Sequence, residues 1–192
     1  RGHKDVLQTF ISHKADLNIR GCNEWTPLIS AAYGGHLSCA QLLLAHGADT
    51  DLQIGDGRTA LMWAARGDYL EIISALLAHG ANDQIQDNDG QDALKWAEKE
   101  NKQGAVKVLK ARHEDPDKVT EQIMKEVKKE NVKWDFVKSL IALHPDINYL
   151  NQNGETALRH AWNAENIKLV RLLLDKGAKF DVQNANGETS IQ

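Results

Sequence analysis

The heptapeptide TPLISAA at residues 26–32 returns as TALMWAA at 59–65, as DALKWA at 92–97 and as TALRHA at 156–161. The first three copies begin 33 residues apart, and the fourth begins 64 residues after the third. Because this last step is two periods less two residues, a degenerate unit must lie between the last two copies. A fixed period of this length is typical of a stacked array of short structural units.

A second motif follows the first at a constant offset. It reads LLLAHGA at residues 42–48, LLAHGA at 76–81 and LLLDKGA at 172–178. Each unit therefore holds two short apolar patterns of helical spacing, which predict two helices folded back as a pair. One pair cannot bury its leucine face alone, so its stability must come from neighbouring pairs. We expect an all-α fold.

Residues with known roles at helix ends and turns stand at the borders of these patterns. Side-chain acceptors are expected at the helix starts, where they bind unpaired backbone amides. Glycines are expected after the helix ends and in the tight turns between units. The predicted helix starts are Thr26 (followed by Pro27), Thr59, Asp92 and Thr156; the predicted helix-ending glycines are Gly47, Gly80 and Gly177; the predicted turn glycines are Gly57, Gly90, Gly154 and Gly187.

These motifs resemble the ankyrin repeat family, whose unit reads roughly D-x-x-G-x-T-P-L-H-x-A-A, then G-H, then a leucine-rich helix closed by G-A. The resemblance covers nearly all of the 192 residues. It implies a solenoid of about six stacked repeats, each a helix-turn-helix pair, joined by β-hairpin loops. The family's histidine, which ties neighbouring units together by hydrogen bonds, is absent, so we expect coupling between repeats to depend more on apolar packing. The residues in its place are Ile29, Met62, Lys95 and Arg159.

The resemblance implies that residues 1–192 form a single ankyrin repeat domain. Its approximate units are 1–20 (partial), 21–53, 54–86, 87–117, 118–150 (degenerate), 151–183 and 184–192 (partial). Since the first and last units are incomplete, we expect the chain to be a piece of a longer ankyrin repeat protein. In the degenerate unit, the residues expected to be buried are Val119, Ile123 and Val127 of the first helix, and Phe136, Val137, Leu140 and Ile141 of the second.

Composition excludes several classes of function. The net charge is −4, and neither half of the chain is basic, which disfavours a nucleic-acid partner. No apolar run approaches the ~20 residues that span a bilayer, so we expect no membrane insertion by this segment. Cys22 and Cys39 have no metal or redox spacing, and we interpret both as small buried residues of a reduced protein. We therefore expect an intracellular (cytoplasmic or nuclear) monomer.

Sequence motifs for catalysis and metal binding are missing. There is no phosphate-binding glycine loop, G-x-S-x-G, H-E-x-x-H or paired C-x-x-C, so we expect no enzyme, no cofactor and no metal site. His13, His46 and His79 occupy one position of three successive repeats. Stacked helices lie ~10 Å apart, too far for these side chains to share an ion at ~2 Å. We predict instead that each interacts with a helix C-terminus.

Function is therefore expected from exposed positions that the fold leaves free. In ankyrin repeats these are the hairpin tips, the solvent side of the first helix and the loop after it, which line a concave groove. Here they are rich in aromatic and basic residues, which dominate interface hot spots. The groove candidates are Trp25, Tyr33, Arg58, Trp63, Arg66, Trp96 and Lys99, with Asp56 and Asp89 joining Arg58 and Lys99 in a polar rim.

Two interpretations remain open for the tryptophans of the groove. Trp63 and Trp96 occupy the same position of adjacent repeats, where they either bind a partner or only pack between first helices. Trp25 and Tyr33 have the same two readings. We expect Trp134 and Trp162 to lie in the core.

The function we predict is a non-catalytic scaffold or adaptor module that binds a protein or peptide in the groove. One alternative is a nucleotide-like ligand, with a base between Trp63 and Trp96 and its phosphate near Arg58, Arg66 or Lys99. Another is a spacer or regulatory arm of a larger enzyme.

The turns at Asn18 and Asn148 resemble the asparaginyl hydroxylation sites of some ankyrin repeats. The resemblance makes these two residues candidates for modification. The alternative is that each asparagine only hydrogen-bonds its turn.

Overall fold

The computed structural model describes residues 3–127, 129, 131–143, 147–151, 154–183, 187 and 189. The chain divides into two compact units, Arg1–Lys110 and Ala111–Gln192. Every regular element in the described residues is helical, which confirms the all-α class. That the two units form one continuous domain stays a prediction.

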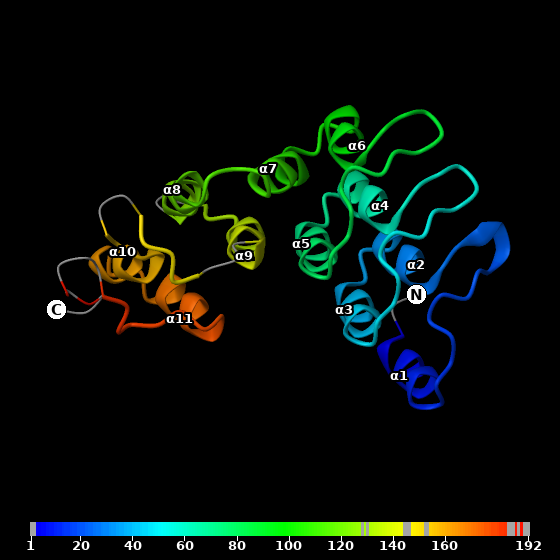
Figure 1. The fold of residues 1–192 in the computed structure, drawn as a ribbon, viewed down its shortest axis with the longest axis horizontal. Coiled ribbons are helices and arrows are strands. Elements are labelled where there is room, and N and C mark those ends of the chain that lie inside the picture. The colour runs from blue at the N-terminus through cyan, green and yellow to red at the C-terminus, as the bar shows by residue number, and fades with distance from the viewer. Residues whose placement is uncertain are drawn as a thin grey trace. The chain divides into compact units, whose positions relative to one another are not determined.

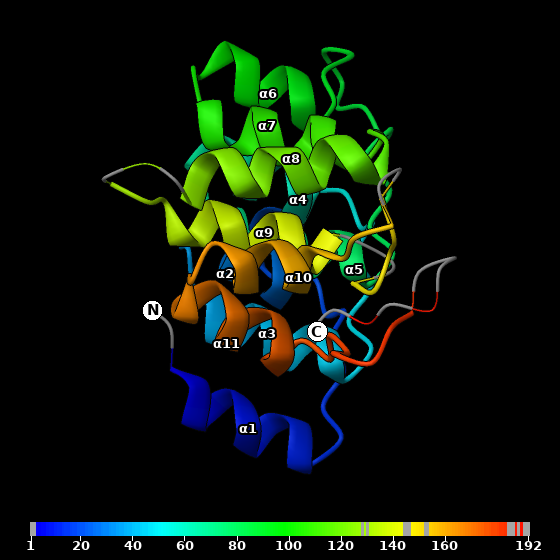
Figure 2. The same cartoon turned by 90° about the vertical axis from the view of Figure 1, so that its left-hand side faces the viewer.

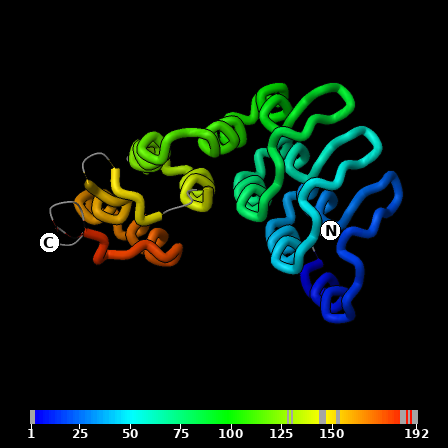
Figure 3. Tube along the Cα trace, in the orientation of Figure 1, coloured from blue at the N-terminus to red at the C-terminus, as the bar shows by residue number. Residues whose placement is uncertain are grey.

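The first unit is a stack of helix pairs (Figure 1). The first helices α2, α4 and α6 contact one another in chain order, and the second helices α1, α3 and α5 form a neighbouring row. The loops that precede α2, α4 and α6 project from the stack on the same side (Figure 3). The elements are α1 (Lys4–Ser12), a 3₁₀ turn (Cys22–Glu24), α2 (Pro27–Tyr33), α3 (Leu37–Ala45), α4 (Ala60–Gly67), α5 (Leu70–Ala78), α6 (Ala93–Lys99) and α7 (Gln103–Ala111).

The second unit holds α8 (Pro116–Val127), α9 (Trp134–Leu143), α10 (Ala157–Asn163) and α11 (Ile167–Asp175). Helix α8 packs on α9 and on α10, and α10 packs on α11 (Figure 2). The expected face of the degenerate unit is confirmed, except that Val127 is only half-buried. Its buried members are Val119, Ile123, Phe136, Val137, Leu140 and Ile141. Most of the expected unit 184–192 lies outside the described residues.

The predicted helix borders are confirmed. In each of the four cases a cap side chain accepts a hydrogen bond from the backbone amide three residues later, which stabilises a helix by about 1 kcal/mol. Gly47, Gly80 and Gly177 have φ values of 82°, 90° and 87°, a conformation that strains other residues. The caps and their donors are Thr26 with Ile29, Thr59 with Met62, Asp92 with Lys95, and Thr156 with Arg159.

Polar bonds also join successive repeats of the first unit. In each, a side chain in one loop bonds a backbone group of the next repeat. The pairs are Arg20 Nη1 to Gln53 O at 2.9 Å, Gln53 Nε2 to Gln86 O at 3.0 Å, the Asp49 amide to Asn18 Oδ1 at 2.9 Å, and the Asn82 amide to Asp51 Oδ1 at 2.9 Å. The expected reliance on apolar packing is therefore incomplete, because other positions of the repeat supply hydrogen bonds between units.

The three repeated histidines lie directly after the second helices, as predicted. The Nδ1 atoms of His13, His46 and His79 each lie 2.8 Å from the carbonyl oxygen of the residue four positions earlier. The Thr9 and Ala75 carbonyls also accept the backbone amide of the same histidine at 3.2 Å, so the imidazole adds a further hydrogen bond at the helix end. The histidines thus cap the helix ends by hydrogen bonds. A neutral imidazole also forms such bonds, so the contact does not require a charged histidine.

Three expectations about burial are wrong. Trp162 is 51% exposed, because the buried residues of α10 are Leu158 and Ala161, and the next residue in the helix turns away from that face. Trp134 is half-buried, with Lys168 Nζ 4.0 Å from its ring centroid. Cys22 is exposed in the loop before α2, whereas Cys39 is buried as expected.

The bonds between repeats lead to a first prediction. Asp51→Ala removes the acceptor for the Asn82 amide, and we expect the free energy of unfolding of the first unit to fall by about 1 kcal/mol. Asp181→Ala is the matched control, because Asp181 has the same repeat position but accepts no hydrogen bond from the described residues. Urea unfolding followed by circular dichroism measures both. Equal losses in the two variants would contradict a role for this bond.

Candidate partner-binding surface

Three aromatic side chains of the first unit form a compact cluster. Trp25 directly precedes the cap of α2, Tyr33 ends α2, and Trp63 lies on α4. The ring centroids of Trp25 and Tyr33 lie 5.1 Å apart, those of Tyr33 and Trp63 lie 5.1 Å apart, and those of Trp25 and Trp63 lie 5.5 Å apart. Tyr33 meets both indoles edge to face, the arrangement that the charge distribution of aromatic rings favours.

Three cations continue this cluster toward α6. The guanidinium carbon of Arg58 lies 5.0 Å from the Trp63 ring centroid and 4.4 Å from that of Trp96. Arg66 lies 5.3 Å and 5.8 Å from the same two rings, and Lys99 Nζ lies 4.6 Å from Trp96. We call the whole set the aromatic–cation surface: Trp25, Tyr33, Arg58, Trp63, Arg66, Trp96 and Lys99.

The repeat explains why residues far apart in sequence meet here. Stacking places equivalent positions of successive first helices side by side, so Tyr33, Arg66 and Lys99 form one row. Trp63 and Trp96 form a second row by the same rule. All seven groove candidates therefore come together, as the repeat positions predict.

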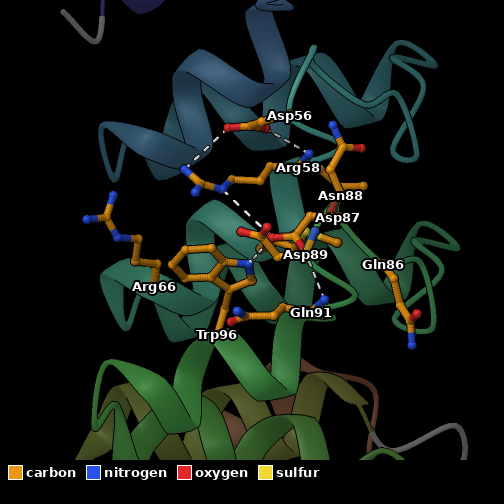
Figure 4. A network of polar contacts seen from close by, with 12 residues as sticks. Asp56, Arg58, Arg66, Gln86, Asp87, Asn88, Asp89, Gln91 and Trp96 are labelled. Carbon is orange, nitrogen blue, oxygen red and sulfur yellow. Dashed lines mark hydrogen bonds and ion pairs between the residues drawn. The ribbon is translucent and has the colours of Figure 1, made fainter.

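A buried carboxylate, that of Asp87, contacts two members of this surface, Arg58 and Trp96 (Figure 4). Asp87 Oδ2 accepts a hydrogen bond from Trp96 Nε1 at 2.8 Å and lies 3.9 Å from Arg58 Nε. Its Oδ1 accepts from the backbone amides of Asp89 and Gln91 at 3.0 Å and 2.9 Å. One side chain thus fixes the turn before α6 and orients the indole of α6.

The pKa of the Asp87 carboxyl lies below its ordinary value of 3.8. Burial alone raises this pKa, but the Gln91 amide, the Trp96 indole, the Asp89 amide and the Arg58 charge together outweigh it. Hydrogen bonds to a carboxylate favour its charged form. Asp87 is therefore ionised at neutral pH.

Exposure differs strongly across the aromatic–cation surface. Tyr33 is 55% exposed, and Arg66 and Lys99 are also exposed. Trp25 and Arg58 are half-buried. Trp63 and Trp96 are only 7% and 5% exposed. The two buried indoles support the cations that cover them, so the surface that solvent reaches consists mainly of Tyr33, Arg66, Lys99 and the edge of Trp25.

Two members of the site are not among the sequence candidates. Asp87 lies in the turn that contains the predicted glycine Gly90, and its partner nine residues later is Trp96. The sequence signal for this role is that the repeat has an aspartate at a position where the preceding repeat has Ile54. Glu100 Oε1 accepts a hydrogen bond from Arg66 Nε at 3.1 Å. This pair joins side chains 34 residues apart, so the repeat register is its only sequence signal.

The two candidate modification residues have equivalent contacts in separate units. Asn18 Oδ1 accepts the Asp49 amide at 2.9 Å, and Asn148 Oδ1 accepts the Lys179 amide at 2.6 Å. Both asparagines therefore bond the following loop. Hydroxylation of either side chain stays a prediction.

Stacked helix pairs with projecting loops define a helical repeat protein that displays an extended side-chain surface. The family model for ankyrin repeats in three copies matches residues 46–120 and 123–192. The model for ankyrin repeats in many copies matches residues 1–44. The chain belongs to the ankyrin repeat family. No curated protein matches it. Within the residues that the structure describes, no helix is long and apolar enough to cross a membrane.

The buried carboxylate leads to a second prediction. Asp87→Asn places an amide NH₂ against the Trp96 indole N–H, and we expect the variant to be about 2 kcal/mol less stable at pH 7. Because the pKa of Asp87 is lowered in the folded state, its carboxylate stabilises the fold above the ordinary value of 3.8. This contribution is lost as the pH falls through the lower folded-state pKa.

The difference in unfolding free energy between wild type and Asp87→Asn should therefore shrink as the pH falls below 3.8. Urea titrations at pH 7 and at several acidic pH values measure it. Asp89→Asn is the control, because the exposed Asp89 side chain makes no hydrogen bond or ion pair with the described residues. A difference that stays constant with pH would contradict the assigned role of the carboxylate.

Proposed function

We propose that the first unit binds a partner protein or peptide on the aromatic–cation surface and performs no chemistry there. Ankyrin repeats are in general protein–protein interaction modules, and the family therefore supports a protein partner. Recognition would use the exposed aromatic and cationic side chains, held in place by the network around Asp87.

The observation that carries this proposal is the exposed row Tyr33, Arg66 and Lys99. The fold does not need these side chains in its core, since α2, α4 and α6 bury other residues, among them Leu28, Leu61 and Ala97. Tyrosine and arginine are also the residue types that contribute most to binding when an interface covers them.

The nucleotide alternative has less support. It requires a base between Trp63 and Trp96, but the Arg58 guanidinium occupies that position at 5.0 Å and 4.4 Å from the two rings. Arg58 is also held by Asp56, whose Oδ2 lies 3.4 Å from its Nη1. We therefore do not propose a nucleotide ligand.

Other properties expected from the sequence stay predictions. These are an intracellular location, a monomeric state, the absence of catalysis and the lack of a nucleic-acid partner. A role as a spacer or regulatory arm of a larger enzyme also stays a prediction. The pull-down described next distinguishes it from partner binding.

The proposal predicts that Trp25→Ala, Tyr33→Ala and Arg66→Ala, introduced together, remove specific partners in a pull-down from cell extract. The reason is that the triple variant deletes the aromatic edge and one cation of the exposed surface. Quantitative mass spectrometry of the captured proteins measures the loss. Thermal melts first establish that the variant stays folded.

A double variant, Ser38→Ala with Gln41→Ala, is the matched control, because both side chains are exposed on α3. Partners kept by the control and lost by the triple variant would support the proposed surface. Partners retained by both variants would reject it. No captured protein with any variant would favour the spacer.

A further inference from the structure

We infer that the aromatic–cation surface recognises an acidic peptide segment in an extended conformation, with a carboxylate at Arg66 and Lys99 and an apolar side chain at Trp25 and Tyr33. The inference rests on the proposed function and adds to it the chemistry and the register of the partner. Its basis is the hydrogen-bonding capacity that this surface leaves unused.

Three carboxylates that contact the surface already have partners. Asp56 pairs with Arg58, Asp87 holds Trp96 and its turn, and Glu100 bonds Arg66 Nε. Lys99 contacts the Trp96 ring but forms no ion pair with any carboxylate in the described part of the chain. Arg66 uses only its Nε, so the four N–H groups on its Nη atoms have no bond to described residues.

The unused groups are almost all donors. Trp63 Nε1 and Arg58 Nε lack an acceptor, but both atoms are buried beneath the surface, so the exposed donors carry the inference. The exposed Lys99 ammonium, the Arg66 Nη groups and the Trp25 indole likewise have no acceptor among the described residues. Only the Tyr33 hydroxyl both donates and accepts. A ligand rich in acceptors fits such a surface, and a carboxylate matches the guanidinium fork best.

The repeat spacing sets the register of the segment. Packed helices lie about 8–10 Å apart, and an extended chain advances about 3.3 Å per residue. A peptide that crosses α2, α4 and α6 therefore advances about three residues per repeat. An apolar side chain on the Trp25–Tyr33 edge places a carboxylate at Arg66 about three residues later and at Lys99 about six residues later.

The experiment is a selection from a displayed library of random dodecapeptides on the immobilised 192-residue chain. We expect enrichment of Asp and Glu over Lys and Arg, three to six positions from an apolar residue. Enriched peptides are then titrated in solution by fluorescence anisotropy. The double variant Arg66→Glu with Lys99→Glu should bind them about tenfold more weakly, because reversal replaces modest attraction with repulsion.

The matched control is Lys118→Glu with Lys179→Glu, which changes the net charge equally at exposed lysines of the second unit. Its affinity should stay at the wild-type value. Glu100→Gln should bind acidic peptides about two- to threefold more tightly, since it releases Arg66 from its carboxylate. A misfolded variant would not gain affinity.

Three outcomes are distinct. Acidic enrichment that the charge reversal abolishes and the control keeps supports the inference. If peptide binding depends on Trp25 and Tyr33 but the selected peptides show no excess of acidic residues, the inference is overturned. The proposed binding surface is then still supported. No enrichment, or enrichment that no variant of the aromatic–cation surface changes, rejects both the inference and the surface as a peptide site.

Discussion

One helix pair of this chain cannot bury its own apolar face, and the stacking of pairs on a 33-residue period is what makes the fold possible. Helices α2, α4 and α6 contact one another directly, as do α1, α3 and α5. The polar bonds from Arg20 to Gln53 and from Gln53 to Gln86 repeat at the same interval. Burial of apolar area favours stacking but does not select one alignment of neighbouring repeats. These hydrogen bonds form only when neighbouring repeats are aligned in one register. Stability and register thus have different physical sources.

The same stacking creates the aromatic–cation surface. Because equivalent residues become neighbours, a tryptophan in one repeat meets the tryptophan of the next, and Arg58 fits between Trp63 and Trp96. In this position the Arg58 Nε is buried without a hydrogen bond, and the Asp87 carboxylate at 3.9 Å compensates the charge of the guanidinium. Packing within the array therefore fixes which groups remain exposed to solvent.

Local features of the fold were predictable from sequence, and features that depend on neighbouring side chains were not. The caps at Thr26 and Thr59 and the glycine at Gly47 depend on two or three adjacent residues, so a short motif specifies them. The repeat register also brought all seven groove candidates together. Trp63 is covered by Arg58 and Arg66 of its own repeat and by Trp25 and Tyr33 of the preceding repeat. Exposure of Trp162 depends on which face of α10 has a neighbour. No motif within one repeat carries that information.

In the second unit, polar residues occupy repeat positions that correspond to Trp96, Arg58 and Asp87 of the first unit. His160 has the repeat position of Trp96, Glu155 that of Arg58, and Asn151 that of Asp87. The three side chains still form a polar network, since His160 Nε2 lies 2.9 Å from Glu155 Oε2 and 3.3 Å from Asn151 Nδ2. The turn is kept as well, because Asn151 Oδ1 accepts the Glu155 amide at 2.9 Å. The fold therefore tolerates polar residues at these positions, and stacking alone does not require Trp63 and Trp96. Their presence in adjacent repeats of the first unit is better explained by the surface that they support.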